Sequence, residues 1–561
     1  MKKRYFLILA LSGLLVFLKS CYKDLGNYDY NEINELSVLG LAANYEVDQD
    51  DSLRLEVDLM GTQYADTTRF DFAWEVGRQT IYKYKDLNVR VGLAIGRYLG
   101  RYIVTDKETG AKTYFQFSLR VSSSTAGDLI VVLSKENGQA ELSYKRLDKE
   151  SDFVANYYRD RVGKSLGINP KAILINYNNM PNMQPFGFTT TTGGLQVLLE
   201  NEWKVINKND MVADSLIGDV KPTSFTNYMS PYPVPDVSNF KADYVRYQIG
   251  MWNYNPYGGI NQDGNMYMVS DGALYYVRMD SYGATVRVNQ RGAENARLSP
   301  MICYGQAGHE PQGSKPTLTN KGFKLSSLVL LFDEANGKFL YSNSGNYPTT
   351  IAKKQEGEYL PRFPGYKMVY ATHTSEPNKC VVVLSKDGVS KLLYMHVPPT
   401  STEERTVPFA IEGELDVPSS LINKETKFYP MTFNPYIVFN TKDRIYKYNT
   451  LSIKEKIMPS QVLATLSDMG YDAHASIESF TVSRTEKTIF LAISNYGSDK
   501  EGSGTVLKGD VVKLDFDKAA TKVKFNQVYR GISGFPVDIQ IKYQNFLREG
   551  VDKDNNLIDK I

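Results

Sequence analysis

One pattern recurs along most of this chain: an apolar strand, a tight polar turn and a second strand. We find it seven times between Leu129 and Leu514, at intervals of about 50 to 70 residues. An isolated hairpin is marginally stable in water, but hairpins arranged radially as four-stranded blades bury one another's faces. The pattern therefore predicts a β-propeller over residues 127–561, with seven blades.

The seven hairpins turn around short polar segments. These segments are residues 135–138, 200–202, 270–272, 333–337, 386–388, 441–443 and a glycine-rich stretch within 488–514. Their spacing is longer than the 40 to 45 residues of a WD40 repeat and closer to that of kelch repeats. Because no strict signature returns in each repeat, two packed sandwiches of unknown topology remain the alternative.

A denser set of short strands precedes the hairpins. Residues 52–59 alternate polar and apolar side chains, and strands are also expected at residues 70–76, 99–106 and 114–121. About 90 residues of short strands with a central Trp are typical of an immunoglobulin-like sandwich. We predict that residues 33–122 form an antiparallel sandwich with Trp74 in its core, followed by a small polar linker at residues 122–127.

Two motifs in this N-terminal region resemble a known family. Phe72-Ala73-Trp74-Glu75-Val76 gives F-x-W-x-V, and the stretch from Gly100 to Asp106 gives G-x-Y-x-V-x-D. Together they resemble the PKD-like domain at the N-terminus of Bacteroidota surface lipoproteins. The Gly-Asp-Gly turn of the parent PKD family is missing. The resemblance implies a protein similar to those encoded beside outer-membrane nutrient importers of the starch-utilisation type.

The first residues predict where the protein is located. Three positive charges in residues 1–4 precede an uncharged apolar run, and Leu18 and Ser20 come before Cys21. This is the pattern of a lipoprotein signal peptide over residues 1–20, with Cys21 as the lipidated residue and residues 21–32 as a tether. The alternative is an ordinary signal peptide with a coincidental cysteine. The Lys23-Asp24 pair favours display on the surface of the outer membrane.

Composition excludes several functional classes. The net charge of +2 comes from interspersed charges, so there is no basic footprint for nucleic acid, and lipid alone would hold the protein to a membrane. The four His residues show no metal-ligand spacing, and no motif predicts a cofactor or a catalytic site. Cys303 and Cys380 form a disulfide or remain two buried thiols.

Three stretches interrupt the strand pattern. Short helices are expected within residues 152–166 and 460–468. Residues 225–264 form a long loop rich in Pro and aromatic residues. Sugars stack their C–H faces on flat rings, so this loop is the predicted ligand-binding segment. Its candidate residues are Tyr228, Tyr232, Trp252, Tyr254 and Tyr257. The alternative is that these rings pack the loop onto the propeller, with Tyr244 and Tyr247 in a strand.

These observations support three hypotheses about function. The first is a non-catalytic binding protein, anchored in the outer membrane, that captures a glycan or a peptide for a nutrient importer. The second is a glycoside hydrolase or lyase on a propeller, which requires two or more acidic side chains that converge on the central channel. The third is a structural or adhesion protein in which the sandwich is a spacer and the propeller binds another protein.

Overall fold

The computed structural model divides into two compact units, Met1–Ser124 and Thr125–Ile561. The division lies inside the linker predicted at residues 122–127. The structure describes residues 34–148, 150–175, 195–200, 203–206, 210–212, 243–248, 253–255, 259–261, 265–278, 285–287, 296–301, 303–307, 324–343, 350–351, 358–376, 378–398, 407–431, 434–483, 485–517 and 521–543.

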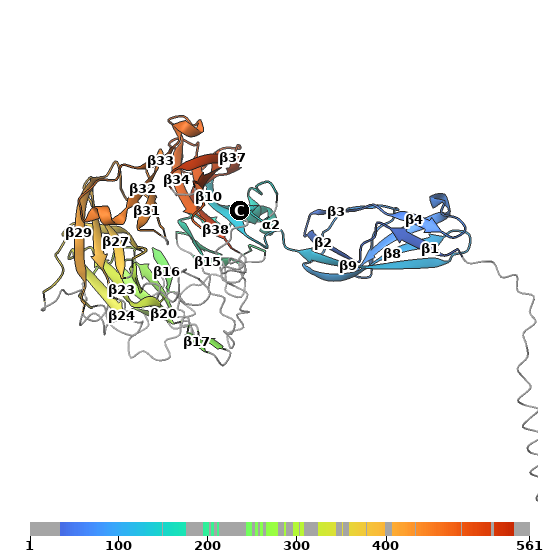
Figure 1. Cartoon of the computed structure of the whole chain (residues 1–561), viewed down its shortest axis with the longest axis horizontal. Helices are drawn as coiled ribbons and strands as arrows, with labels where there is room; N and C mark the ends of the chain where they lie inside the picture. Colours follow the sequence, from blue (N-terminus) through green and yellow to red (C-terminus); the bar gives the residue numbers. More distant parts are fainter. Residues whose placement is uncertain are drawn as a thin grey trace, which may run out of the picture. The chain divides into compact units, whose positions relative to one another are not determined.

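The first unit is a sandwich of two β layers (Figure 1). One layer is a five-stranded sheet in the order β2 (Asn44–Asp48), β9 (Lys112–Ser122), β8 (Gly96–Asp106), β5 (Phe70–Val76) and β6 (Gln79–Tyr82). The other contains the pairs β1 (Leu36–Leu39) with β4 (Asp58–Gly61) and β3 (Ser52–Leu55) with β7 (Leu87–Arg90). A 3-10 turn, η1 (Thr67–Arg69), precedes β5.

Trp74 occupies the centre of the sandwich, as predicted. Its side chain is fully buried, its ring centroid lies 4.4 Å from that of Tyr102, and its Nε1–H donates to the Tyr84 carbonyl at 3.0 Å. Two details differ from the sequence-based expectation. The stretch 52–59 is divided between β3 and β4, and the sheet is not wholly antiparallel because β2 runs parallel to β9.

The second unit is a β-propeller built from consecutive antiparallel sheets (Figure 1). In each four-stranded sheet of this series, the order of the strands along the chain is also their order in space, from the inner to the outer position. The sheets are β13 (Ala172–Ile175), β14 (Leu195–Leu198), β15 (Trp203–Ile206); β16 (Tyr244–Gln248), β19 (Asn265–Ser270), β20 (Ala273–Arg278), β21 (Thr285–Arg287); β22 (Cys303–Ala307), β23 (Lys324–Asp333), β24 (Lys338–Asn343), β25 (Thr350–Ile351); β26 (Lys367–His373), β27 (Lys379–Lys386), β28 (Val389–His396), β29 (Ala410–Pro418); β30 (Phe428–Pro430), β31 (Tyr436–Asn440), β32 (Arg444–Asn449), β33 (Val462–Thr465); and β34 (Ser476–Val482), β35 (Thr488–Ser494), β36 (Gly509–Phe516), β37 (Val523–Ser533).

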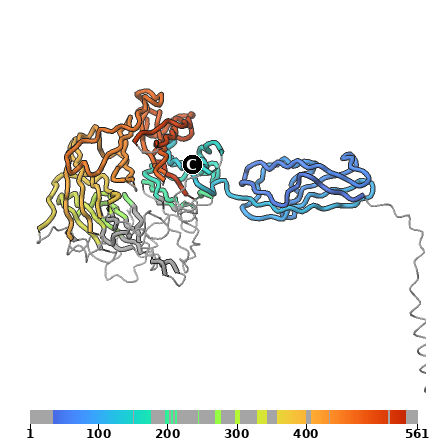
Figure 2. The backbone as a smooth tube through the Cα atoms, viewed as in Figure 1, coloured from blue at the N-terminus to red at the C-terminus, as the bar shows by residue number. Residues whose placement is uncertain are grey.

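One further sheet joins the two ends of the second unit. Its order is β12 (Gly167–Ile168), β11 (Gln139–Arg146), β10 (Leu129–Glu136) and β38 (Phe535–Lys542), so the C-terminal strand lies beside the first strands of the propeller (Figure 2). Leu129 is paired with Lys542, whose Nζ donates to the Thr125 carbonyl at 3.0 Å. This sheet closes the ring.

Hydrophobic clusters connect the sheets of the ring. Six of them among the described residues each join consecutive sheets. One joins the last sheet to the first, since Phe490 and Val511 pack with Ile130, Ile539 and their neighbours. The central strands of a sheet are therefore buried on both faces, which explains why they are apolar along their whole length. The number of seven blades stays a prediction.

The hairpins that connect central strands use a common turn chemistry. Asn137-Gly138, Asp271-Gly272 and Asp387-Gly388 each place both residues at positive φ. This is the type I′ turn, for which Asn-Gly and Asp-Gly are the preferred sequences. All seven predicted hairpins are present as strand pairs, from β10–β11 to β35–β36.

The interrupting stretches are only partly as predicted. The helix expected at 152–166 is a six-residue helix, α2 (Tyr157–Val162). The helix expected at 460–468 is wrong, because this stretch forms the outer strand β33 and enters a 3-10 turn, η5 (Ser467–Met469). A further 3-10 turn, η4 (Thr450–Ile453), follows β32. The loop expected at 225–264 contains strand β16 and the hairpin β17 (Asn253–Asn255) with β18 (Gly259–Asn261).

Candidate functional site

A glycine-rich insert, residues 495–508, connects β35 to β36 in the last sheet. The insert reaches the β10–β11 turn of the first sheet, where the Glu501 carbonyl accepts from Gly138 N–H at 3.1 Å. Glu501 also pairs with Lys135 at 3.0 Å. Gly502 has a φ of +65°, and a Cβ there would lie 2.0 Å from the Lys135 carbonyl oxygen. Glycine is therefore required for this close approach.

Glu478 lies near the insert, on the inner strand β34. The strand is otherwise buried, and a bulge between Ile477 and Ser479 leaves Glu478 half-buried. Burial raises the pKa of the Glu478 carboxyl, while a hydrogen bond from Ser476 and the charges of nearby lysines oppose this shift. The bulge thus places a half-buried carboxylate on a strand whose other residues are buried.

Three charged side chains act electrostatically on this carboxylate. Lys500 on the insert and Lys427 before β30 attract the Glu478 charge, and Glu425 repels it. Lys500 Nζ lies 3.6 Å from Glu425 Oε1, and both side chains are exposed. We call Glu425, Lys427, Ser476, Glu478 and Lys500 the insert surface.

The position of the insert surface depends on a buried amide. Asn440, at the end of β31, accepts from Lys427 N–H at 2.7 Å and donates to the Ile477 carbonyl at 2.9 Å. It thereby fixes the start of β30 to the start of β34. This buried amide therefore connects the two segments that carry Lys427 and Glu478.

The insert surface has the chemistry of a polar binding surface. Carboxylate oxygens accept hydrogen bonds, lysine ammonium groups donate them, and a hydroxyl group can serve as either partner. A ligand with many hydroxyl groups can therefore satisfy both kinds of side chain.

A second acidic side chain on the inner strands has a different role. Asp538, on β38, accepts from Ser479 Oγ at 2.7 Å through Oδ1 and from Ile173 N–H at 2.8 Å through Oδ2. Ser479 lies on β34 and Ile173 on β13, so one carboxylate links the inner strands of three sheets. Both oxygens are used in this link. Asp538 thus stabilises the ring rather than facing a ligand.

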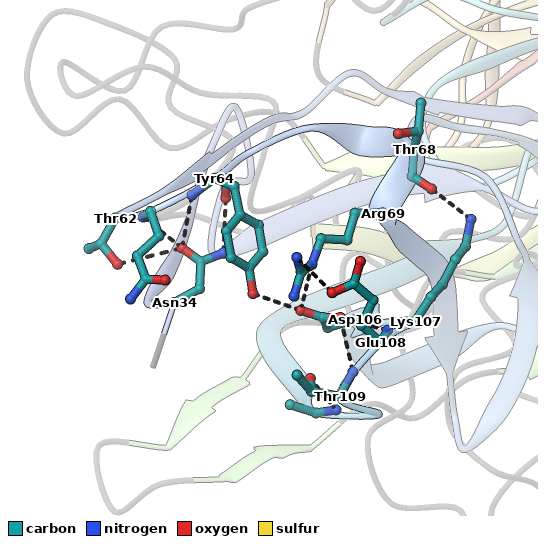
Figure 3. A network of polar contacts seen from close by, with 11 residues as sticks. Asn34, Thr62, Tyr64, Thr68, Arg69, Asp106, Lys107, Glu108 and Thr109 are labelled. Atoms are coloured by element: carbon teal, nitrogen blue, oxygen red, sulfur yellow. Dashed lines mark hydrogen bonds and ion pairs between the residues drawn. The ribbon is translucent and has the colours of Figure 1, made fainter. Parts of the chain in front are cut away.

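The sandwich contains its own polar network around Asp106 (Figure 3). Asp106 Oδ2 accepts from the Tyr64 hydroxyl at 2.9 Å and from Arg69 Nε at 3.0 Å. Its Oδ1 accepts from the backbone N–H groups of Glu108 at 2.8 Å and Thr109 at 3.2 Å. Burial acts to raise the pKa of Asp106, but these hydrogen bonds outweigh it and lower the pKa to about 2.

The same network holds the beginning of the described chain. Asn34 Nδ2 donates to the Tyr64 carbonyl at 2.9 Å, and the Arg69 guanidinium lies 3.8 Å from the centroid of the Tyr64 ring (Figure 3). These contacts connect the first described residue, Asn34, to the turn after β8. They are contacts within the fold, so the network stabilises this end of the sandwich.

Most of the predicted site residues lie outside the described residues. These are Cys21, Tyr228, Tyr232, Trp252 and Tyr257. Tyr254 lies in β17, where its backbone is paired with Ile260 of β18. The predicted aromatic binding segment and the lipidation site therefore stay predictions.

Other sequence-based questions receive direct answers. Cys303 and Cys380 are buried in one hydrophobic cluster and form no disulfide. Among the described residues, no group of His, Cys, Asp or Glu side chains is placed to hold a metal ion. No helix in the described part of the chain is long and apolar enough to cross a membrane.

The insert surface was missed by sequence reasoning. Its residues come from three separate segments, and the visible signal is the glycine-rich insert, which the sequence pattern assigns to a hairpin.

Comparison with known proteins supports part of this description. Residues 21–170 match the PKD-like family, which confirms the predicted N-terminal PKD-like domain; the match extends through β12 of the second unit. Comparison with curated proteins gives no match.

Solved structures show a distant likeness. A quinoprotein alcohol dehydrogenase-like protein from Bacteroides thetaiotaomicron is 10% identical with a TM-score of 0.41, and the alignment covers 91% of this chain and 99% of that one. The WD40 domain of SCAP from fission yeast is 9% identical with a TM-score of 0.28, covering 74% and 88%. TM-scores this low do not support a fold assignment, so the assignment of the second unit as a propeller depends on its sheet topology.

Proposed function

We propose that this protein is a lipoprotein of the bacterial outer membrane, anchored through Cys21 and displayed on the cell surface, that captures a glycan for a nutrient importer. The observation that carries the proposal is the insert surface. It presents the Lys500 ammonium group and the Glu425 carboxylate to solvent beside the half-buried Glu478, whereas Asp538, the other inner-strand carboxylate described above, is used to hold the ring together. This division of roles favours binding over catalysis.

The match at residues 21–170 supports the anchored location. It begins at Cys21, the residue that follows the predicted signal peptide. Proteins that the N-terminal motifs resemble are surface lipoproteins, and a binding protein beside an importer needs both an anchor and a ligand-binding domain. The sandwich would be the spacer between them in the chain.

A glycan array tests the binding function. The protein without residues 1–21 should retain at least one glycan, whose affinity is then measured in solution. Lys500→Ala removes one charge-assisted hydrogen-bond donor and should weaken binding about tenfold. Lys524→Ala, at an exposed position on β37, is the matched control and should change affinity less than twofold.

The aromatic segment gives a separate arm of the same experiment. Trp252→Ala should also weaken binding about tenfold with little change in the thermal melt, if its ring stacks on the sugar. A large loss of thermal stability with unchanged affinity would assign Trp252 to packing instead.

Cell fractionation tests the location. Cys21→Ala should release the protein from the membrane fraction or stop its processing, because the acylated thiol is gone. Protease treatment of intact cells should remove the wild-type protein. Membrane retention of Cys21→Ala, or full protection of the wild type, would contradict the anchored or the surface location, respectively.

A further inference from the structure

We propose that the captured glycan is acidic, and that Arg530, at the base of the glycine-rich insert, binds a carboxylate group on one of its sugars. This inference rests on the proposed function, because it names the class of glycan that the protein captures. Its own support is a second polar cluster, built around Asp510.

Asp510 follows the insert, near the start of β36, and is almost fully buried, with an exposed fraction of 3%. Its Oδ1 accepts from Gly531 N–H at 2.8 Å. Its Oδ2 accepts from the Tyr471 hydroxyl and from Asn495 Nδ2, both at 2.9 Å. Buried polar groups are stable when hydrogen bonds satisfy them, and these three donors fix the position of the carboxylate.

A bulge in β37 brings Arg530 to this carboxylate. The pairing of β37 with β36 is irregular here, and residues 530–532 lie opposite the single residue Asp510. Gly531 has a φ of +61°, a conformation that favours glycine. Bulges interrupt the regular alternation of a strand and change the direction of a side chain. The bulge therefore sets where the Arg530 side chain begins.

Two contacts hold the Arg530 guanidinium. Its Nη1 lies 3.3 Å from Asp510 Oδ2, and its Cζ lies 5.0 Å from the centroid of the Tyr471 ring. The Tyr471 ring is itself buried, and its hydroxyl donates to the same Asp510 oxygen. The guanidinium is thus placed against an aromatic face and a carboxylate that are both fixed by the fold.

The Arg530 side chain is nevertheless 60% exposed. Among the described residues, its only hydrogen-bond acceptor is Asp510, which uses Nη1. The Nε–H and the Nη2 hydrogens are therefore available to a ligand. These N–H groups form one edge of the planar guanidinium, and that edge matches the two oxygens of a carboxylate.

A second cation lies on the neighbouring segment. A Cβ at Gly531 would lie 3.2 Å from the Leu507 carbonyl oxygen, so the end of the insert runs beside the bulge. Lys508, the next residue of the insert, is exposed, and its Nζ lies 5.7 Å from the centroid of the Tyr496 ring. Arg530 and Lys508 therefore place two positive charges on adjacent segments.

The two acidic side chains of the insert already have partners within the fold. Asp499 accepts from Glu501 N–H at 2.9 Å and from Ser503 N–H at 2.8 Å. Glu501 forms its ion pair with Lys135. A glycan with carboxylates on several sugars can thus form charge-assisted hydrogen bonds with the cations, and such bonds are stronger than those of hydroxyl groups. Its hydroxyl groups can still donate to Glu478 of the insert surface.

Paired glycans test this inference. Homogalacturonan, alginate and chondroitin carry carboxylates, and each is compared with its carboxyl-reduced form, in which a hydroxymethyl group replaces the carboxylate. The protein without residues 1–21 is screened on all six and then titrated with each glycan that it retains. At least one acidic form should bind, and its carboxyl-reduced form should bind at least about tenfold more weakly.

Substitutions at Arg530 then identify the residue that recognises the carboxylate. Arg530→Gln should weaken binding of the acidic form about tenfold and of the carboxyl-reduced form less than twofold. Arg530→Lys keeps the charge but loses the paired N–H groups, so it should weaken binding of the acidic form about threefold. Because Asp510 keeps its three other donors, the thermal melts of both variants should stay within about 2 °C of the wild type.

Arg444→Gln is the matched control. Arg444 Nε also pairs with an aspartate, Asp443, at 3.2 Å, but the side chains of both residues are exposed. This arginine therefore has no buried carboxylate to orient it, and its substitution should change the affinity for the acidic glycan less than twofold.

The inference is overturned if the carboxyl-reduced forms bind as tightly as the acidic ones, if Arg530→Gln weakens both forms equally, or if Arg530→Gln and Arg444→Gln have the same effect. Binding confined to neutral or sulfated glycans on the wider array also overturns it, while the proposed capture of a glycan stands. An array on which no glycan is retained overturns the proposed function, and this inference with it.

Discussion

The sandwich and the propeller are both built mainly from antiparallel hairpins, but they pair their first and last strands differently. In the sandwich, the first strand, β1, pairs with β4, and the last strand, β9, pairs with β2 and β8 in the other layer. In the propeller, β10 and β38 are antiparallel and the two ends emerge together. The first and last strands of the propeller therefore close a ring, whereas those of the sandwich belong to different sheets and close none.

The largest expected effect comes from removing the strand that closes the ring. Truncation after Gly534 deletes β38, including the buried side chains of Phe535, Ile539 and Ile541. Each contributes about 1.5–3 kcal/mol, and the sum is comparable with the whole stability of a domain. Calorimetry should show that the propeller transition is lost while the sandwich transition remains. A propeller that still melts cooperatively would mean that β38 does not close the ring.

A core substitution should affect the other unit. Trp74→Ala removes a fully buried ring and should cost the sandwich about 3–5 kcal/mol, which lowers its melting temperature by about 15–30 °C. Tyr84→Ala is the control, because this ring is 70% exposed and only its carbonyl contacts Trp74. If Trp74→Ala lowers both transitions equally, the two units do not fold independently.

Low pH should destabilise the sandwich through Asp106, which belongs to this unit alone. Its pKa in the folded sandwich is about 2, below the value of about 4 for an unfolded chain. The stabilisation is therefore complete above about pH 4 and is lost as the pH falls toward 2. Asp106→Asn should flatten this dependence in melts of the sandwich between pH 2 and 6. An unchanged pH profile in the variant would show that the hydrogen bonds to Asp106 do not favour its charged form.

The smallest effect has the opposite sign and concerns the propeller. Burial raises the pKa of Glu478, so its charged form destabilises the fold at neutral pH; this cost decreases as the pH falls through the folded pKa and is gone below the unfolded value of about 4. Glu478→Gln should raise the propeller melting temperature at pH 7 by about 1–2 °C. Glu501→Gln, which loses an ion pair with Lys135, should give no increase. A decrease for Glu478→Gln would mean that the lysines dominate over burial.

Sequence reasoning found the central strands of the propeller because they are buried on both faces. Strands such as β27 and β35 read as continuous apolar runs next to a turn. The outer strands are partly exposed, and β33 has only four residues that follow a possible Ser cap, so the sequence predicts a helix that begins at Ser460. The sequence does not identify β38 as the closing strand. Its partner β10 lies about 400 residues earlier, and a local sequence pattern cannot predict which distant strands pair.

The candidate site was less accessible to sequence reasoning than the fold. Ile173, Ser479 and Asp538 come together from three distant segments, and the insert surface likewise combines residues from before β30, from β34 and from the insert. Single polar residues in such segments resemble ordinary turn or strand residues. In contrast, the core position of Trp74 was predicted correctly, because a large ring within a strand of alternating residues is stable when it is buried.

The most direct test of the account is the affinity of an array-selected glycan for the intact protein, for Lys500→Ala and for Lys524→Ala, measured by titration under one buffer condition. The account predicts about tenfold weaker binding for Lys500→Ala and an unchanged affinity for Lys524→Ala, with thermal melts that agree for all three proteins. Equal affinities for the three proteins, or an array on which the intact protein retains no glycan, would contradict it.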